Sequence, residues 1–188
     1  MLEVFKRLKE GNERFVSDNL NPDYQHKQRR EMLVKGQKPD AVILSCSDSR
    51  IVPEIIFDAG LGELFIIRVA GNVANPSSIA SIEFAVSYLG VKVVVVLGHQ
   101  DCGAVTAAAK GGDNGKNINI LFSFIQPAIQ SAPKNATIDD IVKEHAALTA
   151  KELINKSEII KNAIDKNELK VVHAFYRMDS GKVDFLDE

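Results

Sequence analysis

Four consecutive valines, Val93 to Val96, lie within an apolar run that extends from Val91 to Leu97. A strand with apolar side chains on both faces has to be covered on both faces, as in the parallel sheets of α/β proteins. Three further runs are typical of strands: Ala41 to Leu44, Leu64 to Val69 and Leu169 to Phe175. Together these runs predict a central, mostly parallel sheet flanked by helices.

The segment between the second and third runs carries helix signals. Asn75 is a candidate N-cap before Pro76, and Gly90 is the expected stop. Apolar residues recur between them at helical spacing, at Ile79, Ile82, Val86 and Leu89. The resulting strand-helix-strand unit favours parallel pairing of its two strands.

The second half of the chain adds further elements. Residues 103–110 predict a short alanine-rich helix, and Thr137 to Asp140 resembles a capping box that opens a longer one. Residues 175–185 predict a hairpin whose second arm adds an antiparallel edge strand. The expected fold class is therefore α/β, with four parallel strands plus an antiparallel C-terminal edge strand.

The first 35 residues are expected to form a helical arm with a broken apolar stripe, which Asn21-Pro22 interrupts. We expect this arm to pack on a partner subunit rather than on its own core. A chain of 188 residues with 45% hydrophobic residues is long enough for one substantial core, so residues 1–188 are predicted to be a single domain.

The charge balance argues against partners that bind through charge. The 23 basic and 25 acidic side chains give a net charge of -2, which supplies no field for nucleic acid or an anionic membrane. No stretch reaches the roughly 20 apolar residues of a membrane span, and the mixed N-terminus is unlike a signal peptide. We expect a cytoplasmic protein, in which Cys46 and Cys102 are ligands, a nucleophile or core thiols rather than a disulfide.

Two polar motifs follow predicted strands, Ser45 to Arg50 after the first and Gly98 to Gly103 after the third. Parallel sheets place their sites at the carboxyl ends of strands. In an extended chain Cys46, Asp48 and Arg50 would share one face, with neighbours in this set about 6.6 Å apart. The sequence therefore predicts a site that combines a thiol, a carboxylate and a guanidinium.

Cys46, His99 and Cys102 form a candidate Cys2His metal-ligand set. Three protein ligands with an open fourth position are typical of catalytic zinc, although Asp48 as a fourth ligand would give a structural site. If a helix begins at His99, it and Cys102 would share one face. A helix N-terminus there would favour the Cys102 thiolate.

The pattern Cys46-x-Asp48-x-Arg50 followed by His99-x-x-Cys102-Gly103 resembles the signature of the β-class carbonic anhydrases. The resemblance covers nearly the whole chain. It extends to Gly36-Gln37, Gly62 to Phe65, Arg68 to Asn72, Ser81 to Ala85 and the closing hairpin from Tyr176 to Leu186.

This resemblance implies a zinc lyase that hydrates carbon dioxide reversibly to bicarbonate and a proton, by means of zinc-bound hydroxide. The residues that correspond to the family's site are Cys46, His99 and Cys102 as ligands of one Zn²⁺ per subunit, Asp48 and Arg50 as a catalytic dyad, and Gln37, Phe65 and Phe84 as substrate-binding residues. Gln37 matches a glutamine that contacts substrate oxygen from the neighbouring subunit. The family also implies a homodimer, or a homotetramer built as a dimer of dimers, with the site at the subunit interface.

The chain departs from the family pattern at three places. Phe84 stands where many members have a tyrosine, and Val69 replaces an asparagine. The chain has no tryptophan, and Ile43 occupies the position of the tryptophan used by members that inhibit themselves with bicarbonate. We therefore expect the openly accessible form of the site.

Other functions stay open at this point. The same scaffold could hydrolyse carbonyl sulfide or carbon disulfide, which are linear molecules like carbon dioxide. A non-catalytic zinc-binding or bicarbonate-binding domain would not need Asp48, Arg50 and Gln37 together, and a dithiol redox protein would lack stoichiometric metal. No proton shuttle is assigned, because His145 and His173 lie within predicted elements and are expected to be structural.

Overall fold

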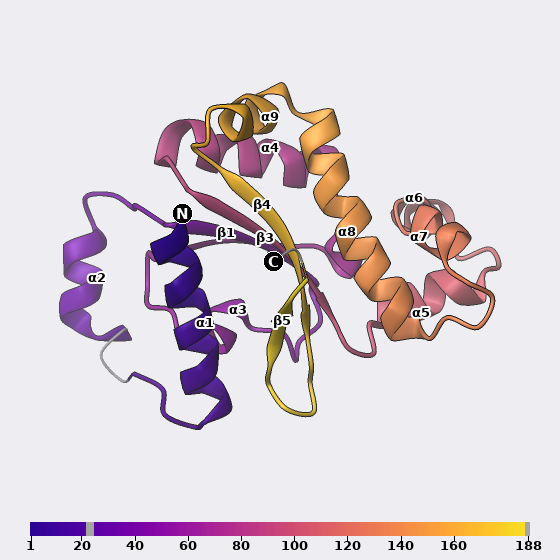
Figure 1. Cartoon of the computed structure of the whole chain (residues 1–188), viewed down its shortest axis with the longest axis horizontal. Coiled ribbons are helices and arrows are strands. Elements are labelled where there is room, and N and C mark those ends of the chain that lie inside the picture. The colour runs from indigo at the N-terminus through magenta and orange to yellow at the C-terminus, as the bar shows by residue number, and fades with distance from the viewer. Residues whose placement is uncertain (22–24, 187–188) are drawn as a thin grey trace.

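The computed structural model describes residues 1–21 and 25–186 and contains one five-stranded sheet of order β2-β1-β3-β4-β5. Its strands are β1 (Ala41–Ser45), β2 (Leu64–Arg68), β3 (Val93–His99), β4 (Lys170–Tyr176) and β5 (Val183–Phe185). β1 to β4 pair in parallel and β5 is antiparallel to β4. The predicted fold class is confirmed, including the antiparallel edge strand (Figure 1).

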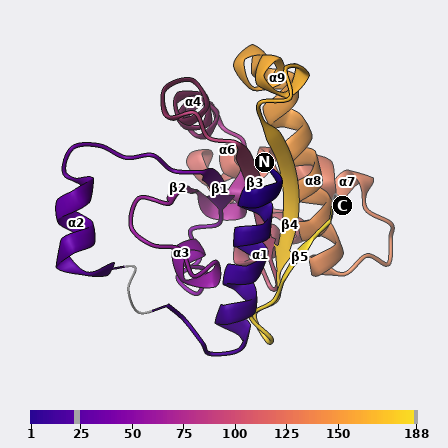
Figure 2. The same cartoon turned by 60° about the vertical axis from the view of Figure 1, so that its left-hand side comes forward.

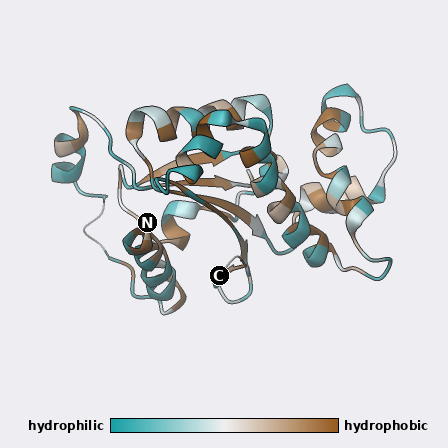
Figure 3. Ribbon diagram, turned by 45° about the horizontal axis from the view of Figure 1, so that its top comes forward, coloured by the Kyte–Doolittle hydropathy of each residue, from teal (hydrophilic) through white to brown (hydrophobic). Residues whose placement is uncertain are grey.

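The two central strands are buried on both faces, as the continuous apolar runs require. Every residue of β1 and β3 is buried. Ile43 and Val95 face one core cluster, while Leu44 and Val96 face another on the opposite side of the sheet. Figure 3 shows these strands as an apolar layer between helices whose outer faces are largely hydrophilic.

Helices cover both faces of the sheet. One face packs against α1 (Leu2–Val16) and α3 (Pro53–Ile56). The other packs against α4 (Pro76–Phe84), its π-helical continuation η3 (Ala85–Leu89), α8 (Ile138–Lys156) and α9 (Glu158–Asp165). No helix in residues 1–21 and 25–186 combines the length and apolar character that crossing a membrane requires.

The helices predicted after Asn75 and over residues 103–110 are where the sequence predicts them. Asn75 accepts a hydrogen bond from the Ser78 amide at the start of α4, and α5 spans Gly103–Lys110. The short helices α3, α6 (Lys116–Ser123), α7 (Gln126–Ser131) and α9 were not predicted. Each of them has eight residues or fewer, too few to repeat an apolar stripe over several turns.

The N-terminal arm divides into two parts with different roles. Helix α1 packs on its own chain, with Val4, Phe5 and Leu8 buried, so the expectation that the arm packs only on a partner is wrong for α1. The Asn12 side chain also donates to the Gly181 carbonyl at 2.8 Å. Helix α2 (Lys27–Leu33) buries no residue and lies at the margin of the fold, as Figure 2 shows, where Arg29 donates to the Leu61 carbonyl at 2.9 Å. The predicted break at Asn21-Pro22 includes Pro22, which lies outside the described residues.

The capping box of α8 gives a stability prediction. The Thr137 hydroxyl lies 2.7 Å from Asp140 Oδ2 and accepts from the Asp140 amide at 3.2 Å. We expect Thr137→Ala to lower the free energy of unfolding by about 1 kcal/mol, because the cap hydroxyl is lost. Urea unfolding measures this, with Thr137→Ser as the control that keeps the hydroxyl. Equal losses in both variants would contradict the capping explanation.

Candidate metal centre

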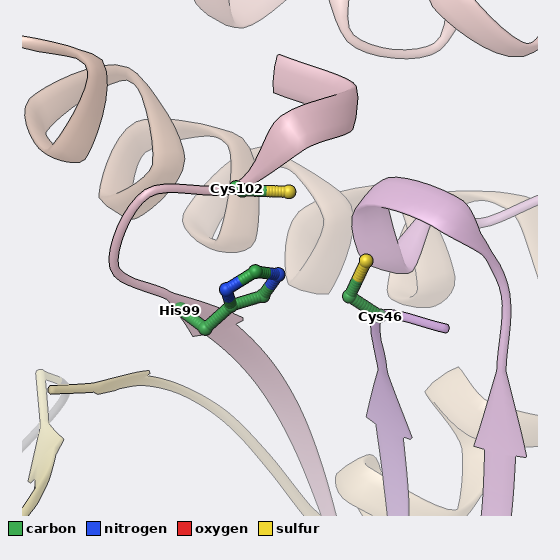
Figure 4. Close-up of side chains that lie close together, drawn as sticks. All are labelled: Cys46, His99 and Cys102. Carbon is green, nitrogen blue, oxygen red and sulfur yellow. The ribbon is translucent and has the colours of Figure 1, made fainter. Parts of the chain in front are cut away.

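Cys46, His99 and Cys102 meet at the carboxyl end of the sheet. Cys46 directly follows β1, His99 is the last residue of β3, and Cys102 precedes the first residue of α5. All three are buried, and one ligand atom from each lies within 4.8 Å of the other two. In Figure 4 the two sulfur atoms and the imidazole ring converge on a common space.

The sheet topology explains why the site forms here. The chain leaves β1 for β2 on one side, whereas it leaves β3 for β4 on the other side. The crevice between β1 and β3 is thus the point at which strand order reverses, where α/β proteins place their ligands.

His99 is oriented as a ligand by its neighbour. Its Nδ1 lies 2.9 Å from the Gln100 carbonyl oxygen, and since that oxygen can only accept, Nδ1 carries the proton. Nε2 therefore has a free lone pair. This atom is fully buried and has no hydrogen-bond partner within residues 1–21 and 25–186. A bound cation would satisfy it, so the observation fits a metal.

The two thiols also favour a cation. The Cys102 thiol hydrogen-bonds to Cys46, which lowers the Cys46 pKa to about 4, and donation from the Gly71 amide at 3.3 Å acts in the same direction. The same interaction with Cys46, together with burial, raises the pKa of Cys102. The pair therefore shares one proton, and a cation that replaces this proton would stabilise both sulfurs as thiolates.

Cys102 lies at the N-terminus of α5, as predicted. The Ala104 and Val105 amides donate to its sulfur and favour the thiolate. The expectation that His99 and Cys102 share a helix face is wrong, because His99 ends β3 and a turn follows it. In that turn Asp101 has a left-handed φ of 53°.

Asp48 and Arg50 lie next to the ligands as a bidentate pair. Arg50 Nε donates to Asp48 Oδ1 at 2.9 Å, and Arg50 Nη2 donates to Oδ2 at 2.8 Å. These hydrogen bonds hold the pKa of Asp48 well below its usual range. An extended chain does not produce this pairing, since β1 ends at Ser45 and Ser49-Arg50 form a turn. Arg68 fixes the backbone by donating to the Asp48 carbonyl at 2.6 Å.

None of the three predicted substrate-binding residues belongs to the core cluster that contains the cysteines. Phe65 of β2 and Phe84 of α4 have ring centroids 6.4 Å apart, and Phe84 stacks on Tyr88 at 5.1 Å. Phe65 packs against the core cluster that contains Leu44, and the cysteines belong to another cluster. Gln37 is exposed in the segment before β1.

Three residues that support the ligands were not predicted in that role. Gly71 donates to Cys46, Gln100 accepts from His99, and His145 contacts Gly71. Gln100 Oε1 also accepts from the Met178 amide at 3.0 Å, which ties the ligand turn to the C-terminal hairpin. The structural role expected for His145 fits its buried hydrogen bond, but its partner is distant in sequence and no local pattern identifies it.

Comparisons with known proteins point in one direction. A family model described as carbonic anhydrase matches residues 41–183. Carbonic anhydrase 2 of Mycobacterium tuberculosis is 37% identical over 185 residues, covering 95% of this chain and 89% of that protein. The solved β-carbonic anhydrase CafA of Aspergillus fumigatus gives a TM-score of 0.75 at 31% identity, over 86% of this chain and 82% of that one. A tetrameric β-carbonic anhydrase of Sordaria macrospora gives a TM-score of 0.77 at 24% identity, over 85% of this chain and 86% of that one. At this identity the match shows a similar fold.

Metal content tests the ligand set. We expect the purified chain to hold about one zinc per subunit, because a Cys2His set with an open position is a zinc-binding pattern. Cys46→Ala should weaken zinc affinity by more than the roughly 10–100-fold typical of losing an outer-shell contact. Elemental analysis after dialysis against a chelator measures this, with the exposed neighbour change Ser47→Ala as control. Full zinc retention by Cys46→Ala would exclude Cys46 as a ligand.

Proposed function

This chain belongs to the β-carbonic anhydrase family, and on that premise we propose that it catalyses the reversible hydration of carbon dioxide to bicarbonate and a proton. The observation that carries the proposal is the buried Cys46, His99 and Cys102 cluster with the Asp48–Arg50 pair beside it. A cytoplasmic location, which we also propose, would keep both cysteines reduced.

The protein side of the mechanism follows from the charge states of the site. Zinc held by the three ligands would activate a water molecule for addition to carbon dioxide. Asp48 is ionised at neutral pH, and Arg50 lowers its pKa further, so its carboxylate can only accept hydrogen bonds. We propose that Asp48 accepts from the reacting water and orients it, and that Arg50 holds the carboxylate in place with two parallel hydrogen bonds.

We propose that Gln37, Phe65 and Phe84 line the pocket of a partner subunit. β2 is an outer strand of the sheet, and its side chains are only partly buried. Phe84 is 46% exposed and Tyr88 is 78% exposed beside it. An open sheet edge next to exposed aromatic rings favours contact with a second copy. The tetrameric relative from Sordaria macrospora supports a dimer or a dimer of dimers, and α2 is available as an additional contact.

The direct test is a stopped-flow indicator assay of carbon dioxide hydration on protein of known zinc content. We expect hydration that rises toward alkaline pH, because two thiolates cancel the formal charge of the metal and weaken its effect on water. The activity should vanish in Cys46→Ala and persist in Ser47→Ala. A profile that is flat from acid to neutral pH would contradict the charge argument.

Full zinc occupancy with negligible hydration would contradict the proposed substrate. The same protein would then be assayed with carbonyl sulfide and carbon disulfide, and after that for bicarbonate binding without turnover.

Arg50→Ala tests the restraint on Asp48. Without its partner the Asp48 carboxylate is free to compete for the fourth coordination position, so we expect activity to fall and the site to close. In cobalt-substituted protein the visible spectrum should become insensitive to small anions that replace water. Asp48→Asn in the Arg50→Ala background is the control, because an amide is a poorer ligand. A spectrum that still responds to anions would refute the closure.

The subunit interface gives a further prediction. We expect Phe84→Asp to shift the protein toward monomers, since it places a charge in the aromatic patch of Phe65, Phe84 and Tyr88. Ile118→Asp on α6 is a matched control, because Ile118 is 47% exposed and lies outside this patch. Sedimentation velocity measures the outcome. Dissociation by both variants, or by neither, would contradict the proposed interface.

A further inference from the structure

Gly71 lies between the Cys46 sulfur and a buried histidine of α8. Its amide donates to Cys46 Sγ at 3.3 Å, and its carbonyl oxygen lies 2.7 Å from His145 Nε2. His145 is 2% exposed. One residue thus connects a predicted metal ligand to a side chain that the proposed mechanism does not use.

The direction of the histidine contact is fixed by chemistry. A carbonyl oxygen only accepts, so Nε2 of His145 carries the proton and donates. Burial lowers the pKa of His145, which keeps the ring neutral. A neutral, buried imidazole that is bonded to the backbone does not carry protons to solvent, but it can hold a loop in position.

Gly71 depends on such support because its backbone conformation is unusual. It lies in the short turn η2 (Ala70–Asn72) with a left-handed φ of 68°. This φ favours glycine, and a Cβ at this position would also approach Ile125 Cδ1 to 2.9 Å, so the Ile125 side chain would have to shift. The hydrogen bond from His145 restrains the Gly71 carbonyl, and the hydrogen bond to the Cys46 sulfur restrains the Gly71 amide.

Helix α8, which carries His145, is held closely against the sheet. It packs directly on β3 at Gly98, where a Cβ would lie 2.8 Å from Val142 Cγ1 and 3.5 Å from the Ala146 Cβ. His145 lies between these two residues of α8 in sequence. Because α8 packs closely on β3, the strand that ends at His99, it also positions His145 within hydrogen-bond distance of Gly71.

We propose that His145 is a positioning residue of the metal centre, whose hydrogen bond to Gly71 keeps the Gly71 amide directed at the Cys46 thiolate. This inference rests on the proposed zinc site. An amide that donates to a ligand sulfur withdraws charge from it and fixes its orientation toward the metal. Loss of the His145 bond would leave a buried carbonyl unpaired, release the turn and loosen Cys46 as a ligand.

The test compares two substitutions of His145 in the zinc-loaded 188-residue chain. His145→Leu removes the donor, and we expect zinc release to a colorimetric chelator to accelerate by about 10–100-fold, as for other outer-shell losses. His145→Gln keeps an N–H donor at similar reach and should restore a rate near that of the parent. In the cobalt form, the sulfur-to-cobalt charge-transfer band should shift in His145→Leu and not in His145→Gln.

A control separates positioning from stability. Leu153→Ala removes a fully buried side chain of the same helix that packs in a different cluster from the cysteines. It should lower the free energy of unfolding without accelerating zinc release from folded protein. Parent-like zinc release from His145→Leu, or equally fast release from both His145 variants, would overturn the inference. A parent protein that binds no zinc would overturn the proposed function as well, so the two failures are distinguishable.

A second pair of variants covers the case in which His145→Leu does not fold. Gly71 and Gly90 both have a φ of 68°, but a Cβ at Gly90 meets nothing within 4 Å. Gly71→Ala and Gly90→Ala therefore share the backbone cost of a left-handed alanine, but only Gly71→Ala also brings a Cβ against Ile125. Faster zinc release from Gly71→Ala alone would support the inference that the geometry of this turn holds Cys46, and equal release from both variants would overturn it.

Discussion

The parallel pairing of β1 with β3 is the constraint on which the rest of the structure depends. Its register aligns Ser45 with Leu97, so that Cys46 leaves β1 beside the last two residues of β3, Gly98 and His99. Both strands are buried throughout, so the two core clusters fix this register from opposite faces. A slip of one residue would turn every side chain of a strand to the other face. The position of the metal site is therefore a consequence of core packing.

The sequence predicts the parts of this arrangement that depend on local pattern. Continuous apolar runs identify the buried strands, and the Asn75 and Thr137 caps locate two helices. The three candidate ligands could be named because their residue types occur together at the ends of two strands, where parallel sheets place their sites. The geometry of Asp48 and Arg50 could not be derived by alternation, since a turn and the Arg68 contact place them. The links from His145 to Gly71 and from Gln100 to Met178 join segments more than 70 residues apart, and no local pattern encodes them.

Each ligand of the cluster is held by a different part of the fold. Cys46 receives the Gly71 amide from the turn after β2, and Cys102 receives amides from the first turn of α5. His99 is oriented by Gln100, which in turn is bonded to the C-terminal hairpin. These supports come together only when the sheet, α5 and the hairpin are all in place. Metal binding and completion of the fold should therefore be coupled, because an unfolded chain cannot offer the preformed site.

The ligands and the substrate pocket place different demands on the chain. Metal ligands need burial and a fixed orientation. The carboxyl end of the sheet provides both for Cys46, His99 and Cys102 within a single chain. An apolar pocket for a small gas molecule needs side chains that close over the metal without displacing the packed core around it. Under the proposed assembly these come from the outer strand β2 and from α4 of a second copy, where Phe65 and Phe84 are free of the ligand cluster. The open edge of β2, which would be an aggregation risk in an isolated chain, then becomes the surface that completes the site.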